Sequence, residues 1–331
     1  MRVRPSLRDG EPATPVAERD GALSHLAAFY AGADDYLAAV IPFLRDGQET
    51  DDATFVAVPA DRLDMVRDGL GADSSRVTFA DMSLLGANPG RIIPAIQGFL
   101  DDHRGRRVRF VGEPIWPSRC ACELREATRH ESLINLAFAA EPIAILCPYD
   151  TSVLAPSVIA DAERTHPTLV RGGRSAASAA YGRAWRLPAS CDGPLPEPPA
   201  DAEEFRFSGG GDLARLRHHL GDRAREAGFD VRRISDLEVA VSEVLTNTLR
   251  YAPGGGSLRI WGRDDRLYCQ VDDEGRLEDP LAGRRAPVSG SVGGWGLLLA
   301  NRVCDLVEIR SGSAGTAVRL HLSNRDVAAA A

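Results

Sequence analysis

Short apolar runs that alternate with longer amphipathic segments constrain the fold of the first half of the chain. Four such runs are ATFVAV (53 to 58), RVTFAD (76 to 81), RVRFVG (107 to 112) and PIAILCPYD (142 to 150). Helix-length amphipathic segments separate them, and strands spaced in this way are typical of βαβ units. We therefore predict an α/β domain with a mainly parallel sheet over residues 22–186.

A proline-rich segment separates this pattern from a different one. Residues 187–204 hold five prolines and few large apolar side chains, which predicts a semi-rigid linker. Beyond it, two helical segments precede two pairs of alternating strands, which predicts an α+β domain with an antiparallel sheet over residues 205–323. We expect residues 1–21 to form a flexible leader and residues 324–331 a tail. Even in a fully polyproline-like conformation the linker would span at most about 55 Å, which keeps the domains close enough to touch.

Lysine is absent from the 331 residues, so arginine supplies all 39 basic side chains. A P-loop nucleotide site and Schiff-base or pyridoxal-phosphate chemistry each need a lysine, and both are therefore excluded. The 47 acidic residues give a formal net charge of −8, which offers no electrostatic reason to bind nucleic acid or an anionic membrane. The composition favours a protein partner or a small ligand.

The remaining composition indicates a cytoplasmic protein. No apolar run reaches the ~18 residues of a membrane span, and the first residues lack the apolar core of a signal peptide. The six cysteines are scattered without the spacing of a disulfide scaffold, so we expect reduced thiols.

The second helical segment of the second domain carries a carboxylate and a carboxamide one turn apart. In ISDLEVAVSEVLTNTLRYA, Glu243 and Asn247 lie four residues apart and are therefore neighbours on the helix. An amide oxygen can coordinate Mg²⁺, while a carboxylate can orient or deprotonate a nucleophile. Because such pairs also occur on solvated helix faces, the pair indicates a site only in combination with other motifs of the same domain.

Three further motifs follow this helix in the sequence. VDDEGR places Asp273 at a strand end, where a carboxylate can accept a hydrogen bond from an exocyclic amine, with Gly275 in the turn. SGSVGGWGLLLANRVCD is a glycine-rich loop that opens an apolar helix, and such a loop can present free N–H groups to phosphates without lysine. Finally, AGTAVRLHL places Gly315 and Thr316 at the start of the last strand.

This order resembles the N, G1, G2 and G3 boxes of the Bergerat-fold (GHKL) ATPases, over about residues 203–323. The family includes gyrase, histidine kinases and the anti-sigma-factor serine kinases. The resemblance implies a Bergerat sandwich that binds ATP and Mg²⁺. It also implies the following roles: Glu243 as catalytic base, Asn247 as Mg²⁺ ligand, Asp273 as adenine acceptor, Gly275 in the base pocket, Gly294, Gly296 and Leu297 at the phosphates, and Thr316 as a support for Asp273.

Within that family, SEVLTNTLRYA and GGWGLLLANRVCDLVEIRSG are most similar to the anti-sigma-factor serine kinases. The resemblance implies a protein that sequesters a sigma factor and phosphorylates a serine of an antagonist (anti-anti-sigma) protein. Leu277 replaces a glycine that is frequent in the family, so a nucleotide-bound module without kinase activity remains an alternative. An orphan histidine kinase is a further alternative, although His218 and His219 lie on a helix inside the domain and are interpreted as surface residues.

The first domain resembles the MEDS sensory domain over about residues 22–170. The segments that carry this resemblance are HLAAFYAGADDYLAAVIPFLRDG, GEPIWPSRCACELREATRHESLINLAF and AILCPYDTSVL. The resemblance implies a sensory domain that controls the kinase, and a small-molecule signal is one possible input. Whether the protein forms a homodimer is left open.

Several residues of the first domain are candidates for the sensory site, because strand ends and adjoining helix starts are where parallel sheets bind ligands. They are Glu113, Trp116, Arg129, His130, Tyr149 and Asp150, with Glu131, Asn135 and Cys147 nearby in the sequence. Cys120, Cys122, His130 and His166 lack the paired spacing of known zinc modules, so we interpret them as thiols and hydrogen-bonded histidines.

Overall fold

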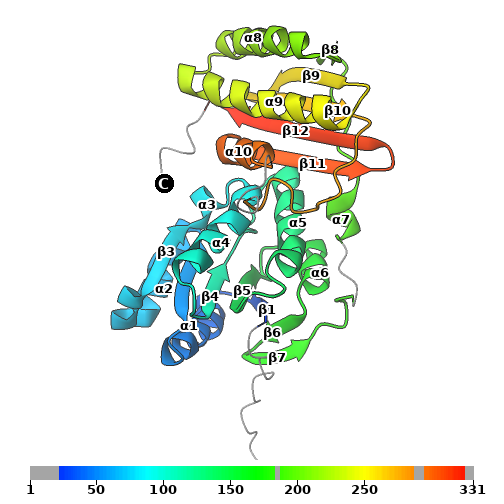
Figure 1. Ribbon diagram of the computed structural model, residues 1–331. Helices are drawn as coiled ribbons and strands as arrows, with labels where there is room; N and C mark the ends of the chain where they lie inside the picture. The colour runs from blue at the N-terminus through cyan, green and yellow to red at the C-terminus, as the bar shows by residue number, and fades with distance from the viewer. Residues whose placement is uncertain (1–21, 183–186, 287–293, 325–331) are drawn as a thin grey trace, which may run out of the picture.

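The computed structural model describes residues 22–182, 187–286 and 294–324. The leader expected for residues 1–21, almost all of the expected tail and residues 287–293 of the glycine-rich loop lie outside the described residues. Two separate sheets, one in each half of the chain, form two domains (Figure 1). None of the described helices is long and apolar enough to cross a membrane.

The first domain is built on a seven-stranded sheet of order β3-β2-β4-β5-β1-β6-β7. Its strands are β1 (Ser24–Tyr30), β2 (Ala53–Val58), β3 (Val77–Asp81), β4 (Val108–Gly112), β5 (Ile143–Asp150), β6 (Thr168–Arg171) and β7 (Arg174–Ala177). All neighbouring pairs are parallel except β6 and β7. This arrangement confirms the predicted α/β class with a mainly parallel sheet.

Helices cover both faces of this sheet. They are α1 (Ala33–Glu49), α2 (Ala60–Leu70), η1 (Gly71–Arg76), α3 (Met82–Leu85), η2 (Pro89–Arg91), α4 (Ile92–Asp102), α5 (Ala121–Ala137) and α6 (Pro156–Thr165). Successive side chains of β1 alternate between two cores: Ala27 and Phe29 pack with α4 and α5, whereas Ala28 and Tyr30 pack with α1 and α2. The central strands are therefore buried on both faces.

The second domain is built on a five-stranded antiparallel sheet of order β11-β12-β10-β9-β8. Its elements are β8 (Glu203–Phe207), α8 (Gly210–Glu226), α9 (Val231–Tyr251), β9 (Gly256–Arg263), β10 (Arg266–Asp273), α10 (Gly296–Val303), β11 (Leu306–Gly312) and β12 (Gly315–Ser323). The three helices pack on one face of the sheet over a single core, which contains Leu237, Val241 and Val271. This is the predicted α+β sandwich.

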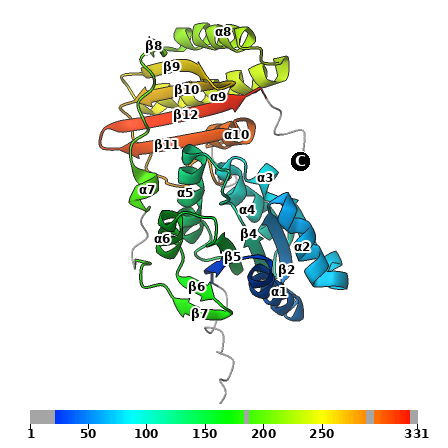
Figure 2. The ribbon, with the colours of Figure 1, turned by 180° about the vertical axis from the view of Figure 1, so that it is seen from behind.

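The other face of this second sheet is polar, and the first domain and the linker contact it. Arg125 of α5 donates to Glu308 of β11, and Arg319 of β12 donates to the carbonyl of Pro196 in the linker. Figure 2 shows the linker running from the short helix α7 (Ala189–Asp192) along the sheet to β8. The domains are therefore in contact in this structure, and the linker lies against the sheet.

Candidate functional site

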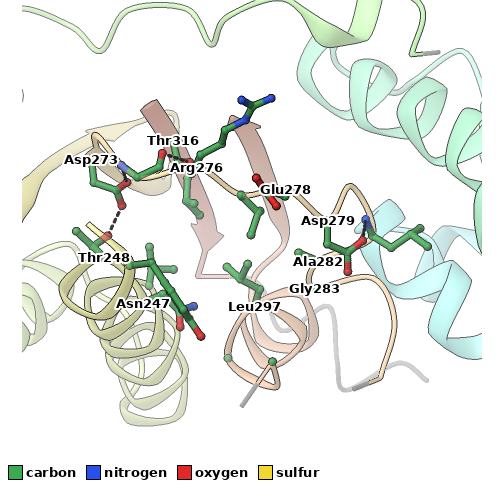
Figure 3. A pocket seen from close by; sticks show the side chains of 18 of the residues that line it. Asn247, Thr248, Asp273, Arg276, Glu278, Asp279, Ala282, Gly283, Leu297 and Thr316 are labelled. Atoms are coloured by element: carbon green, nitrogen blue, oxygen red, sulfur yellow. Dashed lines mark hydrogen bonds between the residues drawn. The ribbon is translucent and has the colours of Figure 1, made fainter. Parts of the chain in front are cut away.

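A cavity of about 640 Å³ opens in the second domain where α9, the end of β10 and the start of α10 meet (Figure 3). Its volume lies within the range of small-molecule sites in proteins. Seven residues that the sequence assigned to nucleotide binding line it: Asn247, Asp273, Gly275, Gly294, Gly296, Leu297 and Thr316. Residues from four separate segments of the chain thus surround one cavity.

Asp273 is held in a fixed orientation at one end of the cavity. The Thr248 hydroxyl donates to its Oδ2 at 2.6 Å, and the Gly275 N–H donates to its Oδ1 at 2.8 Å (Figure 3). Each carboxylate oxygen retains a second lone pair for a ligand donor. Thr316 supports Asp273 through Gly275, because its hydroxyl donates to the carbonyl of Gly275 at 2.9 Å.

Helix α9 positions Asn247 and Glu243. Asp230 caps its start by accepting hydrogen bonds from the N–H groups of Arg232 and Arg233, and its buried stripe fixes the rotation of the helix on the sheet. Asn247 lies on the cavity wall, whereas Glu243 does not line the cavity. The Glu243 carboxylate packs against Gly296, where an added Cβ would lie 2.5 Å from Oε2.

The glycines at the start of α10 give backbone access on the side of the cavity opposite Asp273. Gly294 has a φ of +90°, a conformation that favours glycine, and α10 begins two residues later. The first N–H groups of a helix have no partner within the helix and attract anions. Arg276 and Arg285 also line the cavity, so arginine provides the cationic groups that lysine does not.

A segment that forms one wall of this cavity, residues 276–286, is anchored to the first domain. Leu281 is 3% exposed and packs within the core of the first domain. Arg284 pairs with Glu126 of α5, which also accepts from Arg310 Nη1 at 2.7 Å. Because all three charged side chains are buried, this ion network fixes the segment to α5. We call residues 276–286 the wall segment.

A second cavity, of about 340 Å³, lies on the other side of the wall segment. The first domain and the linker contribute Arg129 and Asp192, whose side chains pair at 3.2 Å. Arg129, one of the predicted sensory residues, therefore lies between the domains and beside the wall segment.

Two residues that support the nucleotide cavity were missed by the sequence analysis. Thr248 lies on the buried, mostly apolar stripe of α9, yet its hydroxyl donates to Asp273. Ser311 shares a hydrogen bond with the Thr316 hydroxyl at 2.7 Å and accepts from the Leu277 N–H at 2.8 Å. A hydroxyl on an apolar helix stripe is the one signal that could have identified Thr248, because a buried hydroxyl needs a partner.

In the first domain, Glu113 and Asp150 lie at the carboxyl edge of the parallel sheet. The Tyr30 hydroxyl donates to Glu113 Oε1 at 3.0 Å, and Arg62 lies 3.6 Å from Asp150. Arg62 also stacks over the rings of Tyr30 and Tyr36. Burial raises the pKa of Glu113 to about 8, although Tyr30 and Arg62 oppose the shift. Glu113 Oε2 and the Tyr36 hydroxyl have no hydrogen-bond partner within the described part of the chain.

The side chains of the other predicted sensory residues do not join this group. Trp116 packs under the Arg119 guanidinium, 3.7 Å from the ring centroid, and Arg129 faces the second cavity. His130 and Tyr149 are buried, and burial lowers the pKa of His130 to about 3. Arg129 and His130 lie in the middle of the 17-residue helix α5, away from the sheet edge, and the Tyr149 side chain packs in the core that contains Ala27 and Phe29.

Comparison with known families identifies the class of both domains. Residues 24–167 match the MEDS family model, described as "MEthanogen/methylotroph, DcmR Sensory domain". Residues 210–322 match the "Histidine kinase-like ATPase domain" model. The chain therefore carries a MEDS domain followed by a histidine kinase-like ATPase domain, which confirms both resemblances.

Individual relatives narrow the classification of the second domain further. It is homologous to the serine-protein kinase RsbW of Bacillus pumilus, with 29% identity over 127 residues, covering 34% of this chain and 78% of the relative. RsbW of Halalkalibacterium halodurans is 32% identical over 102 residues, covering 27% of this chain and 63% of the relative.

Two solved structures are also similar. The RsbU and RsbW domains of a Mycobacterium tuberculosis protein match at 20% identity and a TM-score of 0.29, over 38% of this chain and 33% of that one. The Acinetobacter baumannii histidine kinase AdeS matches at 15% identity and a TM-score of 0.22, over 38% and 68%. The chain thus spans about a third of the first of these solved proteins.

Proposed function

We propose that this protein is an anti-sigma regulatory serine kinase whose MEDS domain controls its ATPase domain. In this proposal the second domain binds a sigma factor, uses Mg²⁺-ATP and phosphorylates a serine of an antagonist protein. The observation that carries the proposal is the convergence of Asn247, Asp273, Gly296 and Thr316 on one cavity, in a domain homologous to RsbW.

The residues around the cavity fit Mg²⁺-ATP. Asp273 is oriented by Thr248 and Gly275 to accept a hydrogen bond from the exocyclic amine of adenine. The amide oxygen of Asn247 is the type of hard ligand that Mg²⁺ prefers. The free N–H groups at the start of α10 and the guanidinium of Arg276 suit phosphates.

Bound Mg²⁺-ATP would supply the phosphoryl group for transfer. Glu243 lies one turn before Asn247 on α9 and is the proposed base that takes the proton from the attacking serine hydroxyl. Since Gly296 packs directly on its carboxylate, the start of α10 holds Glu243 in place behind the glycine that lines the cavity.

The wall segment is the proposed route of control. One side of it lines the nucleotide cavity, and its other side carries Leu281 and Arg284 into the first domain. A ligand that changes the position of α5 would therefore change one wall of the nucleotide site. Its effect is limited to its difference in affinity for the two arrangements, typically ~1–3 kcal/mol.

A nucleotide-bound module that sequesters its partner without transferring phosphate is the second candidate. Two observations favour it: Glu243 does not line the cavity, and Leu277 occupies the wall where the family frequently has glycine. The histidine-kinase alternative has less support, because His218 is exposed to solvent and His219 pairs with Glu203 at 2.9 Å on the side of α8.

A phosphotransfer assay with γ-labelled ATP and antagonist proteins from the same genome tests the proposal. We expect acid-stable label on a partner serine, with Glu243→Gln lowering the rate by ~10²–10⁴ while nucleotide still binds. Glu238→Gln, on the same helix and facing α8, is the matched control and should transfer at the wild-type rate.

Each other outcome selects a different function. Acid-labile label on His218 or His219 would indicate a histidine kinase. Binding of nucleotide and partner without any label would favour the non-catalytic module. Equal affinity for ATP in the wild type and in Asp273→Ala would remove the adenine site itself from the proposal.

A further inference from the structure

Four potential metal ligands from distant parts of the chain meet in the core of the first domain. They are His25 on β1, Glu131 on α5, Cys147 on β5 and His166 directly after α6. Each is at most 2% exposed, and their ligand atoms all lie within 4.8 Å of one another.

Four of the six distances between these atoms match the edges of a tetrahedron around a metal ion. Glu131 Oε2 lies 3.3 Å from His25 Nε2, from His166 Nε2 and from Cys147 Sγ, and Cys147 Sγ lies 3.6 Å from His25 Nε2. Zinc bonds of about 2.0–2.1 Å to nitrogen or oxygen and about 2.3 Å to sulfur give tetrahedral edges of about 3.3–3.6 Å.

The outer hydrogen bonds fix the tautomer of His166. Its Nδ1 lies 2.8 Å from the carbonyl of Ala162, and a carbonyl only accepts, so Nδ1 carries the proton. The neutral ring therefore presents a bare Nε2 toward Glu131. A backbone carbonyl is a frequent outer partner of metal-binding histidines.

His25 is oriented in the same way. Its Nδ1 faces Asn135 Oδ1 at 3.1 Å, and the amide nitrogen of Asn135 donates to the carbonyl of Thr165 at 2.7 Å. Since the amide nitrogen points to a carbonyl, the amide oxygen is the acceptor toward His25. The second imidazole thus also presents a bare Nε2 inward.

Without a cation, these four groups are poorly matched. Two nitrogen lone pairs would face a carboxylate oxygen, and His166 Nε2 and Glu131 Oε1 have no hydrogen-bond partner among the described residues.

We propose that His25, Glu131, Cys147 and His166 form a closed tetrahedral site for a divalent transition metal of the zinc class. One thiolate and one carboxylate neutralise the double positive charge, and the two neutral imidazoles complete the coordination. Four protein ligands without solvent access are typical of a structural zinc site. The site joins α5 to β1, β5 and the end of α6.

This set differs from the cysteines and histidines whose spacing the sequence analysis considered for a metal. Only His166 is shared. Cys120 and Cys122 lie near the exposed start of α5, and His130 is not among the four clustered ligands. The four ligands are spread from residue 25 to residue 166, so no local spacing could reveal them.

Metal analysis of the full-length protein tests this site. The protein is purified without a histidine tag from zinc-supplemented cells, dialysed into metal-free buffer and measured by mass spectrometry. We expect about one zinc per chain. Exchange of the wild type into Co²⁺ should produce tetrahedral ligand-field bands and a thiolate-to-cobalt charge-transfer band.

Two cysteine variants locate the metal. Cys147→Ser should abolish the charge-transfer band and lower the zinc content at least about tenfold. Cys269→Ser, in the core of the second domain, is the matched control and should keep both. Wild-type protein that neither contains zinc nor takes up Co²⁺ would overturn the proposal, independently of whether the variants fold. So would a charge-transfer band that survives in Cys147→Ser and disappears when Cys120 and Cys122 are replaced.

Discussion

Burial of one carboxyl group, that of Glu113, makes the stability of the first domain depend on pH. Glu113 is 5% exposed and has one hydrogen-bond donor, the Tyr30 hydroxyl. Burial is the largest cause of its shift and raises its pKa from 4.5 to about 8. The folded state therefore holds a proton on Glu113 that the unfolded chain releases at much lower pH.

Stability should consequently depend on Glu113 in a defined pH window. A raised folded pKa contributes stability that is fully present below 4.5 and is lost as the pH rises toward about 8. Glu113→Gln keeps an acceptor for Tyr30 and carries no charge. We expect it to change stability by less than about 1 kcal/mol at pH 5 and to stabilise the protein by about 3–4 kcal/mol more at pH 8 than at pH 5.

Urea unfolding at the two pH values measures this difference. Glu163→Gln, at a partly exposed carboxylate paired with Arg171, is the control and should change stability little at either pH. An equal effect of Glu113→Gln at both pH values would mean that Glu113 is ionised when folded.

Sequence reasoning predicted the cavity residues that belong to short motifs. It missed residues whose role depends on a contact with a distant segment of the chain. Asp273 and Gly275 were found because an Asp-x-Gly turn is readable from three residues. Thr248 was missed because its bond to Asp273 crosses 25 positions. The grouping of the four proposed metal ligands was missed for the same reason, since only the packed sheet brings β1 and β5 side by side.

At the scale of elements, the strands that escaped prediction are one without β-branched residues or alternation and two of only four residues each. β1 reads SHLAAFY and is rich in alanine, yet it lies in the interior of the sheet and is buried on both faces. Burial on both faces removes the alternating pattern that identifies half-exposed strands. The short β6 and β7 were missed because four residues carry too little pattern.

The contact between α9 and α10 makes Gly296 a sensitive position. An added Cβ would lie 2.5 Å from the Glu243 carboxylate, so we expect Gly296→Ala to destabilise the protein by about 1–3 kcal/mol. Gly98→Ala on α4 is the matched control, because nothing lies within 4 Å of its added Cβ. There the better helix propensity of alanine should stabilise by about 0.5–1 kcal/mol.

Chemical unfolding of both variants measures the cost of this contact. Combining Gly296→Ala with Glu243→Ala removes the clashing carboxylate and should recover most of the loss. If Gly296→Ala stabilises the protein as Gly98→Ala does, the close packing of Glu243 on α10 is incorrect.

At the scale of the whole molecule, the length of the linker predicted that the domains lie close together. It did not predict which of their surfaces meet. Glu126 lies 158 positions from Arg284 and 184 from Arg310, and nothing in the local sequence of α5 marks it as an interface residue. The two-domain architecture follows from periodicity and from the proline-rich segment. The contact follows from three-dimensional packing, because α5 extends beyond its own sheet and reaches β11 (Figure 1).

This packing places two parts of the proposed mechanism on neighbouring turns of α5. Glu131, in its C-terminal half, belongs to the proposed metal site, and Glu126, five residues earlier, holds Arg284 of the wall segment. A helix transmits a shift along its axis, since its turns are joined by hydrogen bonds. Changes in the first domain would therefore reach the nucleotide cavity through α5.

Replacing Glu126 tests this connection in the full-length chain. Glu126→Gln removes the charge that pairs with Arg284 and Arg310, leaving two buried guanidinium groups without a counter-ion, which typically costs about 3–5 kcal/mol. We expect the wall segment to leave α5 and the affinity for ATP to change at least about fivefold, measured by calorimetry.

The control lies three residues earlier on the same helix. Glu123 is 3.6 Å from Arg266 and partly exposed, so Glu123→Gln removes a weak surface pair and should leave nucleotide affinity within about twofold of wild type. If Glu126→Gln lowers stability and leaves ATP affinity unchanged, the ion network only holds the domains together. In that case a signal from the first domain would have to use a different contact, such as that of Arg91 in η2 with the carbonyl oxygens of Asn301 and Cys304 at the end of α10, or act on the partner proteins directly.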